Sequence, residues 1–120
     1  MYTIKISDEF CGAHNLRGYE GKCENLHGHN WKVEVELVKD KLDNIGMVLD
    51  FKEVKERLKK ILVNLDHKYL NDIAYFKKNN PTSEIIAKYI YDLLKEKLIG
   101  INKVTIWETD TSSASYSDKS

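Results

Sequence analysis

The alternation of residue types from 27 to 38 constrains the fold more than any other feature of the sequence. Even positions are mostly polar, while the odd positions carry rings and aliphatic side chains: His27, His29, Trp31, Val33, Val35 and Leu37. Because successive side chains of a β-strand point to opposite faces of a sheet, this period of two predicts a long, half-buried strand.

The sequence supplies further strands for the same sheet. Residues 2–14 and 101–109 also alternate apolar and polar positions, which predicts one strand in each range. The Ser/Thr-rich end of the chain has strand-compatible residues around Tyr116, with a weaker signal. We therefore expect three clear strands and one weaker strand at the end.

Two segments show helical spacing of apolar residues instead. The first helix is expected over about 51–64, with Asp50 as its cap, and the second over about 81–98. Pro81 suits the first position of the second helix, and Gly100 stops it. Strands followed by helices and then strands predict an α+β fold, with the helices packed on one face of a mainly antiparallel sheet.

Composition and charge narrow the classes of partner. The 120 residues form a single domain, 1–120, and Lys+Arg 19 against Asp+Glu 19 gives a formal net charge of +0. This balance disfavours nucleic acid and membrane surfaces and favours a small molecule or a protein. The longest apolar runs are only a few residues, whereas a bilayer span needs about 20, and the N-terminus does not resemble a signal peptide. We expect a cytoplasmic protein.

The histidines suggest a metal site. His27 and His29 project from the same face of the long strand, where two buried neutral imidazoles are favourable if they share a cation such as zinc. If the first two strands form a hairpin, His14 arrives next to this pair. Three histidines leave one tetrahedral position open, which is the ligand count of a catalytic zinc site. The alternative is a turn with two solvated or core histidines.

Cys23 and the Asp66-His67 pair are candidates for proton transfer. Cys23 lies close in sequence to His27 and could be a zinc thiolate, a buried small residue, or a nucleophile or base activated by the cation. An aspartate that orients an imidazole fixes its tautomer for proton transfer, as Asp66 could do for His67. The alternative for this pair is a polar helix C-terminus.

Glu108 is a candidate for binding a ligand. It lies in phase with Val104 and Ile106, on the inward face of its strand, where a lone carboxylate is costly without a donor-rich partner. A ligand with paired N–H groups would meet that need. The alternative is a carboxylate that reaches solvent at the strand end.

These residues together resemble the 6-pyruvoyl-tetrahydropterin synthase superfamily, and most closely its bacterial branch, the 6-carboxytetrahydropterin synthases of queuosine biosynthesis. The blocks that carry the resemblance are in family order over nearly the whole chain: Phe10-Cys11-Gly12-Ala13-His14, Cys23-Glu24-Asn25-Leu26-His27-Gly28-His29, Gly46-Met47-Val48-Leu49-Asp50-Phe51, Leu65-Asp66-His67-Lys68-Tyr69-Leu70-Asn71, Asn80-Pro81-Thr82-Ser83-Glu84, and Glu108-Thr109 followed by Ala114-Ser115-Tyr116.

The resemblance implies a role for each candidate residue. The implied assignments are zinc on His14, His27 and His29, catalytic base Cys23, proton relay Asp66 with His67, and pterin contacts Glu108 and Thr82. Helix capping explains Thr82 equally well. The implied substrate is 7,8-dihydroneopterin triphosphate, and the implied product is 6-carboxy-5,6,7,8-tetrahydropterin, with loss of triphosphate and acetaldehyde. Basic residues near the loops, such as Arg17 and Lys22, are candidates for contacting the triphosphate.

The resemblance also implies an architecture. Its fold is the tunnelling fold, or T-fold, in which an antiparallel sheet carries two helices on one face and sheets of several subunits close a barrel. The implied assembly is a homo-hexamer built from two trimers, with active sites at subunit interfaces. Closure of a barrel would also remove the open edges of so small a sheet.

Two departures from the family pattern leave alternatives open. Cys11-Gly12 stands where a small or polar residue and then alanine are common, and Cys11 is expected to be a buried packing thiol. Glu24 follows Cys23, and branches that act in folate biosynthesis use a glutamate in this loop. The alternatives are therefore 6-pyruvoyl-tetrahydropterin synthesis, release of 6-hydroxymethyl-dihydropterin with Glu24 as a catalytic residue, or a non-catalytic zinc-stabilised module closed by Cys23.

Overall fold

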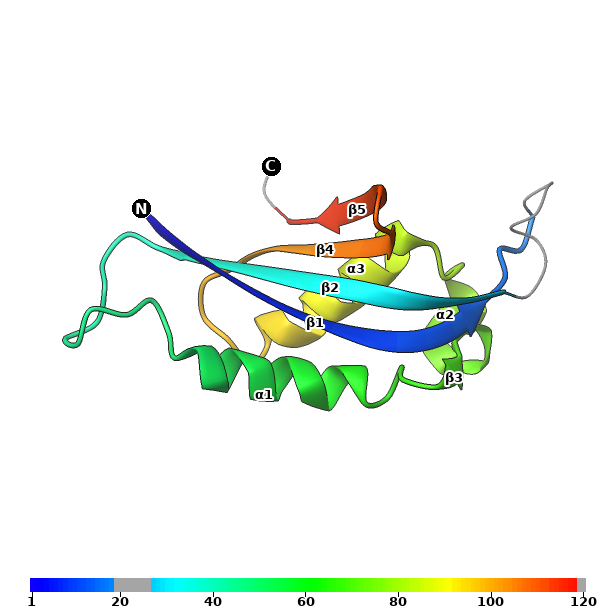
Figure 1. The fold of residues 1–120 in the computed structure, drawn as a ribbon, viewed down its shortest axis with the longest axis horizontal. Helices are drawn as coiled ribbons and strands as arrows, with labels where there is room; N and C mark the ends of the chain where they lie inside the picture. Colours follow the sequence, from blue (N-terminus) through cyan, green and yellow to red (C-terminus); the bar gives the residue numbers. More distant parts are fainter. Residues whose placement is uncertain (19–26, 119–120) are drawn as a thin grey trace.

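The structure, a computed structural model, describes residues 1–18 and 27–118. One mixed sheet, with strand order β3-β1-β2-β4-β5, carries its helices on one face (Figure 1). Its elements in chain order are β1 (Tyr2–His14), β2 (His27–Lys39), α1 (Phe51–Leu62), β3 (Lys68–Tyr69), the 3-10 helix η2 (Leu70–Asp72), α2 (Ala74–Lys78), α3 (Ser83–Lys95), β4 (Ile101–Thr109) and β5 (Ser112–Tyr116).

The hairpin of β1 and β2 contains the two longest strands of the sheet. Its antiparallel register runs without interruption from Tyr2↔Lys39 to His14↔His27, and β4 pairs antiparallel with the other edge of β2. The four expected strands are confirmed. The sheet is not wholly antiparallel, however, because the short β3 pairs parallel with β1 at Gly12 and Ala13.

The core lies between the sheet and helices α1 and α3, which Figure 1 shows on the same side of it. The odd positions of β2 face this layer, and Trp31, Val33, Val35 and Leu37 are all 0% exposed. Lys32, at an even position, is exposed. The expected period of two is therefore confirmed, and it defines an inward face under the helices and an outer face opposite.

The two long helices differ in how well the sequence located them. In α1 the Asp50 carboxylate accepts the Lys52 N–H at 2.9 Å, as expected, and the helix ends at Leu62. The expected start of the second helix at Pro81 is wrong, because α3 begins at Ser83. Thr82 caps it, since its hydroxyl oxygen accepts the Ile85 N–H at 3.1 Å, a function that proline cannot serve.

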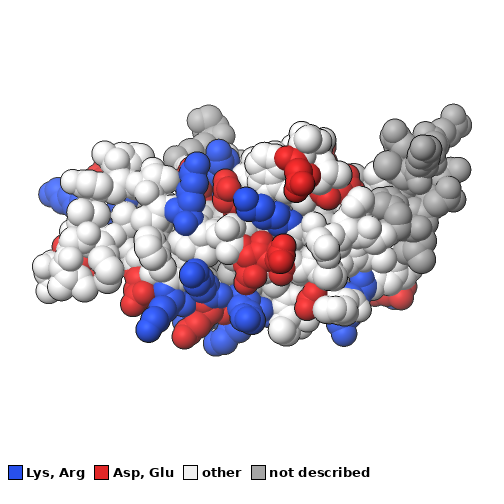
Figure 2. Space-filling view, viewed as in Figure 1, with Lys and Arg blue, Asp and Glu red and all other residues white. Residues whose placement is uncertain are grey.

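The molecule is elongated, with principal extents of 52 × 29 × 26 Å. On the face drawn in Figure 2, acidic and basic side chains are interspersed, in keeping with the formal net charge of +0. Among the described residues, no helix has the length and apolar character needed to span a membrane.

Candidate functional site

Three candidate residues converge where the β1–β2 hairpin meets the end of β4. In the hairpin register Phe10 pairs with Trp31 and Gly12 with His29, so the side chains of His14 and His29 lie on the inward face. Glu108 reaches the same place from β4, two residues beyond the buried Ile106. Its expected position on the inward face is therefore confirmed.

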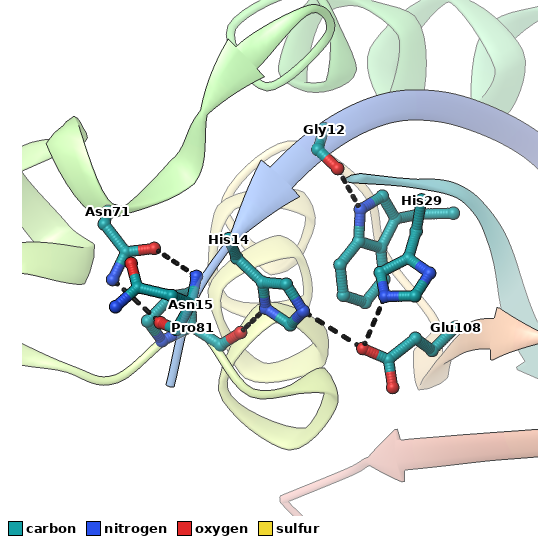
Figure 3. Close-up of polar contacts among 8 residues, drawn as sticks. Gly12, His14, Asn15, His29, Asn71, Pro81 and Glu108 are labelled. Carbon is teal, nitrogen blue, oxygen red and sulfur yellow. Dashed lines mark hydrogen bonds and ion pairs between the residues drawn. The ribbon is translucent and has the colours of Figure 1, made fainter. Parts of the chain in front are cut away.

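One carboxylate oxygen of Glu108 joins the two imidazoles, as Figure 3 shows. Oε1 of Glu108 lies 3.0 Å from Nε2 of His14 and 3.2 Å from Nε2 of His29. Trp31 packs edge-on against both imidazoles, with ring centroids 4.8 Å from His14 and 5.2 Å from His29. The Trp31 Nε1–H donates to the Gly12 carbonyl at 3.1 Å, which fixes the indole behind the cluster.

The backbone of the segment before α3 fixes a proton on Nδ1 of His14. Its Nδ1 lies 2.7 Å from the Pro81 carbonyl oxygen, which only accepts, so Nδ1–H is the donor. Nε2 of His14 then faces the Glu108 carboxylate either with a second proton or with its lone pair. A lone pair facing a carboxylate is repulsive unless a cation lies between the two groups. The arrangement therefore suits a shared proton or a metal ion.

The donor set also fits a metal. The ligand atoms of His14, His29 and Glu108 all lie within 4.8 Å of one another. Two imidazole nitrogens and a carboxylate oxygen are ligands that zinc accepts in catalytic sites, where a fourth position is left for water or substrate. Only the backbone of His27 is described, and it pairs with His14 at the end of the hairpin.

The chain that leaves this cluster is clamped by a buried amide. Asn71, 7% exposed, accepts the Asn15 N–H through Oδ1 at 3.0 Å and donates from Nδ2 to the Asn15 carbonyl at 2.9 Å. Figure 3 shows this double contact directly beside His14. Neither Asn71 nor the Pro81 carbonyl was predicted to support the site. The one sequence signal for Asn71 is its place at the end of the block Leu65-Asp66-His67-Lys68-Tyr69-Leu70-Asn71, which carries the family resemblance.

Asp66 and His67 form the expected pair in the turn after α1. Oδ2 of Asp66 lies 3.1 Å from Nδ1 of His67, while Oδ1 accepts the Cys11 N–H at 2.9 Å. The Cys11 N–H, with a smaller contribution from His67, lowers the pKa of the Asp66 carboxyl below its ordinary value. His67 has φ 57°, the one positive φ among the described non-glycine residues, and its side chain is 78% exposed.

The Asp66-His67 pair lies at the β1 edge of the sheet, whereas His14 and His29 point to the inward face. Cys11 pairs with Asn30 on the strand, one position out of phase with Gly12 and His29, so its side chain points to the outer face. The expectation that Cys11 is a buried packing thiol is therefore wrong, since the residue is only half-buried. The Asp66-His67 turn contacts β1 at Cys11. A hollow of about 510 Å³ at this edge is lined by residues that include Cys11, His29 and His67.

The remaining predicted residues divide into two kinds. Cys23 and Glu24, with Lys22, lie outside the described residues. Thr82 caps α3, and Arg17 donates from Nη2 to the Phe76 carbonyl at 2.6 Å, so both have structural contacts. Their contacts with a pterin or a triphosphate stay predictions.

Comparison with known proteins identifies the family and agrees with the fold. Residues 3–119 match the family described as 6-pyruvoyl tetrahydropterin synthase. The 6-carboxy-5,6,7,8-tetrahydropterin synthase of Synechocystis sp. is 40% identical over 97% of this chain and 93% of its own. That of Haemophilus influenzae is 34% identical over 98% of this chain and 100% of its own.

Solved structures give the same result. The Caenorhabditis elegans 6-pyruvoyl tetrahydropterin synthase superposes with a TM-score of 0.89 at 32% identity, covering 98% of this chain and 96% of its own. The fold is thus the T-fold of lyase-type tetrahydropterin synthases, as expected. The chain belongs to the 6-pyruvoyl tetrahydropterin synthase family.

Proposed function

We propose that this chain is a zinc-dependent 6-carboxy-5,6,7,8-tetrahydropterin synthase of the cytoplasm, acting in the queuosine pathway. It would convert 7,8-dihydroneopterin triphosphate to the 6-carboxy product with loss of triphosphate and acetaldehyde. The observation that carries the proposal is the convergence of His14, His29 and Glu108 at the end of the hairpin, in a chain with relatives named for this reaction.

The metal would be held by His14 and His29, with His27 as the third imidazole. Bound zinc supplies Lewis-acid polarisation of the substrate's side-chain hydroxyls, which acidifies the adjacent C–H. The Nδ1–H bond from His14 to the Pro81 carbonyl keeps Nε2 directed at the cluster. The indole of Trp31 covers both rings and excludes water from that side.

Glu108 would anchor the pterin ring. A carboxylate accepts paired N–H donors in a planar, two-point contact, which the 2-amino-pyrimidinone edge of a pterin offers. With substrate present, the carboxylate that now contacts the two imidazoles would instead receive the pterin N–H groups. Thr82 is placed by the same segment as Pro81, close to this end of the sheet.

Proton transfer would involve Cys23 as the base and His67 as the acid. Asp66 occupies Nδ1 of His67, so Nε2 is the atom that would deliver a proton to the substrate. Cys23 would remove the proton from the carbon next to the polarised hydroxyl. The thiol and the imidazole would thus act at opposite ends of the rearrangement.

We also propose that the site is completed by assembly into a hexamer of two trimers. The Asp66-His67 pair contacts the outer-face residue Cys11, whereas His14 and His29 point to the inward face, which favours a relay from one subunit serving the metal of another. Along residues 2–11 of β1, the described part of the chain offers no strand on the side away from β2. Open edges of this kind favour sheet pairing between subunits. Light scattering that gave a monomer would reject the assembly.

A second activity is favoured by the sequence Cys23-Glu24. A thiol and a carboxyl differ in ordinary pKa by several units, about 8.5 against about 4.3, so they should favour different proton abstractions. Glu24 would then support release of 6-hydroxymethyl-dihydropterin. In the variant Cys23→Ala the carboxylated product should vanish while slow release of the hydroxymethyl product persists.

The deciding experiment is mass spectrometry of the products formed from 7,8-dihydroneopterin triphosphate by the zinc-loaded protein. The 6-carboxy product with acetaldehyde supports the proposal, whereas 6-pyruvoyl-tetrahydropterin would move the chain to the other branch of its family. If no product forms and zinc protects Cys23 from alkylation, the site is a closed structural one. Glu108→Gln is the matched control, because it keeps the shape of the side chain and removes the charge that binds the pterin.

A further inference from the structure

A second cluster of metal-ligating groups lies at the β1 edge of the sheet, beside the outer-face residue Cys11. The ligand atoms of Cys11, Asp66 and His67 are all within 4.8 Å of one another. The cluster lies out of phase with His14 and His29 in the hairpin and shares no residue with their cluster. It combines a thiol sulfur, a carboxylate oxygen and an imidazole nitrogen at one edge of the sheet.

The backbone holds these three donors together. The Cys11 N–H donates to Oδ1 of Asp66 at 2.9 Å, and the His67 N–H donates to the Cys11 carbonyl at 2.6 Å. The positive φ of His67 turns the chain sharply between these contacts. Because the three residues are already fixed to one another, binding an ion requires little further ordering of the backbone.

The chemistry of the donors selects a transition metal. Thiolate sulfur and imidazole nitrogen favour zinc and similar ions over magnesium or calcium. Cys11 is half-buried, and its Sγ donates to Oδ1 of Asn30 at 2.8 Å. A bound ion would replace the thiol proton, which is released to solvent. The hollow of about 510 Å³ next to Cys11 and His67 gives water access to the remaining position.

We propose that Cys11, Asp66 and His67 form a second binding site for a zinc-type divalent ion, and that the occupied site inhibits the enzyme. An ion on the His67 ring would replace the contact of Nδ1 with Asp66 and oppose formation of the imidazolium, so the ring could no longer exchange a proton with the substrate. Binding does not depend on the proposed function, but inhibition does. The two parts are therefore tested separately.

Binding is tested with Co²⁺, which gives a thiolate-to-metal absorption band in the near ultraviolet. The chain has two cysteines, Cys11 and Cys23. In the double variant His14→Ala/Cys23→Ser, a thiolate band can arise only from Cys11. The expected result is a band that saturates near one equivalent of Co²⁺ and disappears on adding Cys11→Ser, which leaves the backbone contacts of residue 11 intact. A double variant without the band overturns the site.

Inhibition is tested by adding Zn²⁺ to the zinc-loaded enzyme. Wild type is expected to lose activity, whereas Cys11→Ser needs about tenfold more Zn²⁺ for the same loss, because one of three ligands is gone. Equal inhibition of both proteins, with the Co²⁺ band present, would mean that the ion does not act through His67. It would overturn the proposal that the occupied site inhibits the enzyme. If the protein has no activity on the pterin substrate, the proposed function is rejected. The Co²⁺ absorption band still decides whether Cys11, Asp66 and His67 bind an ion.

Discussion

The two groups of candidate residues that contain histidines differ in the structure that holds them and in their exposure to solvent. The cluster of His14, His29 and Glu108 depends on three long strands in register, and the His14 side chain is 1% exposed. The pair of Asp66 and His67 depends on one turn, and the His67 side chain is 78% exposed. Strand register and the burial of His14 fix the ligand atoms of the first cluster relative to one another. The exposed turn leaves the second cluster accessible to a substrate or a neighbouring subunit.

The largest effect should follow from changing the buried cluster. Replacing His14 or His29 with Ala should remove most bound metal and reduce activity on the order of 10²-fold or more, because loss of a group that merely hydrogen-bonds to a metal ligand already costs about 10- to 100-fold in metal affinity. Metal content by elemental analysis is the measurement. His67→Ala is the matched control and should retain the metal of the buried site. Full metal content in the His14→Ala protein would contradict this division.

The next effect belongs to the exposed pair. His67→Ala should lower turnover on the order of 10²-fold, the usual contribution of a general acid or base, with the metal still bound. Steady-state kinetics should place the loss in kcat and not in KM. An unchanged kcat would make Asp66 and His67 a structural turn.

Mixing experiments test whether the two clusters work across subunits. Neither His29→Ala nor His67→Ala should be active alone, but hetero-oligomers should recover about a quarter of wild-type activity, because random assembly gives that share of sites one intact half from each subunit. Native mass spectrometry would verify that mixed oligomers form. Mixed oligomers without activity would show that both clusters serve a site within one subunit.

The smallest effect concerns acid stability. The hydrogen bond from Cys11 lowers the pKa of Asp66 in the folded protein, so the ionised carboxylate stabilises the fold at pH values above its ordinary pKa of about 3.9. This stabilisation should disappear as the pH falls through the lowered pKa. Thermal unfolding of wild type and Asp66→Asn should therefore differ by a constant amount near neutral pH and converge in acid. A gap that widens in acid would contradict the assigned cause.

The sequence revealed those parts of the molecule whose residues repeat with a period. The alternation of β2 located the inward face, and the same phase placed His29 and Glu108 on it. The sequence did not predict contacts between distant segments. These are the contact of Glu108 with both imidazoles and the hydrogen bond from His14 to the Pro81 carbonyl. These contacts arise only when β4 and the segment before α3 pack against the hairpin.

Short elements were missed for a different reason. The strand β3 and the helices η2 and α2 span only a few residues each, too few for any periodicity to emerge. The start of α3 was misplaced because proline and threonine both favour a helix N-terminus, and the hydroxyl of Thr82 rather than the ring of Pro81 decided it.

The left-handed backbone conformation of His67 restricts which amino acids can occupy this position without strain. Outside glycine, that region is populated chiefly by asparagine, aspartate and histidine, and β-branched side chains are strongly excluded. Of these residues only histidine exchanges protons near neutral pH without a perturbed pKa. A library of all substitutions at 67, sorted for folding alone, should therefore enrich glycine and asparagine. Sorted for catalysis, the same library should return to histidine.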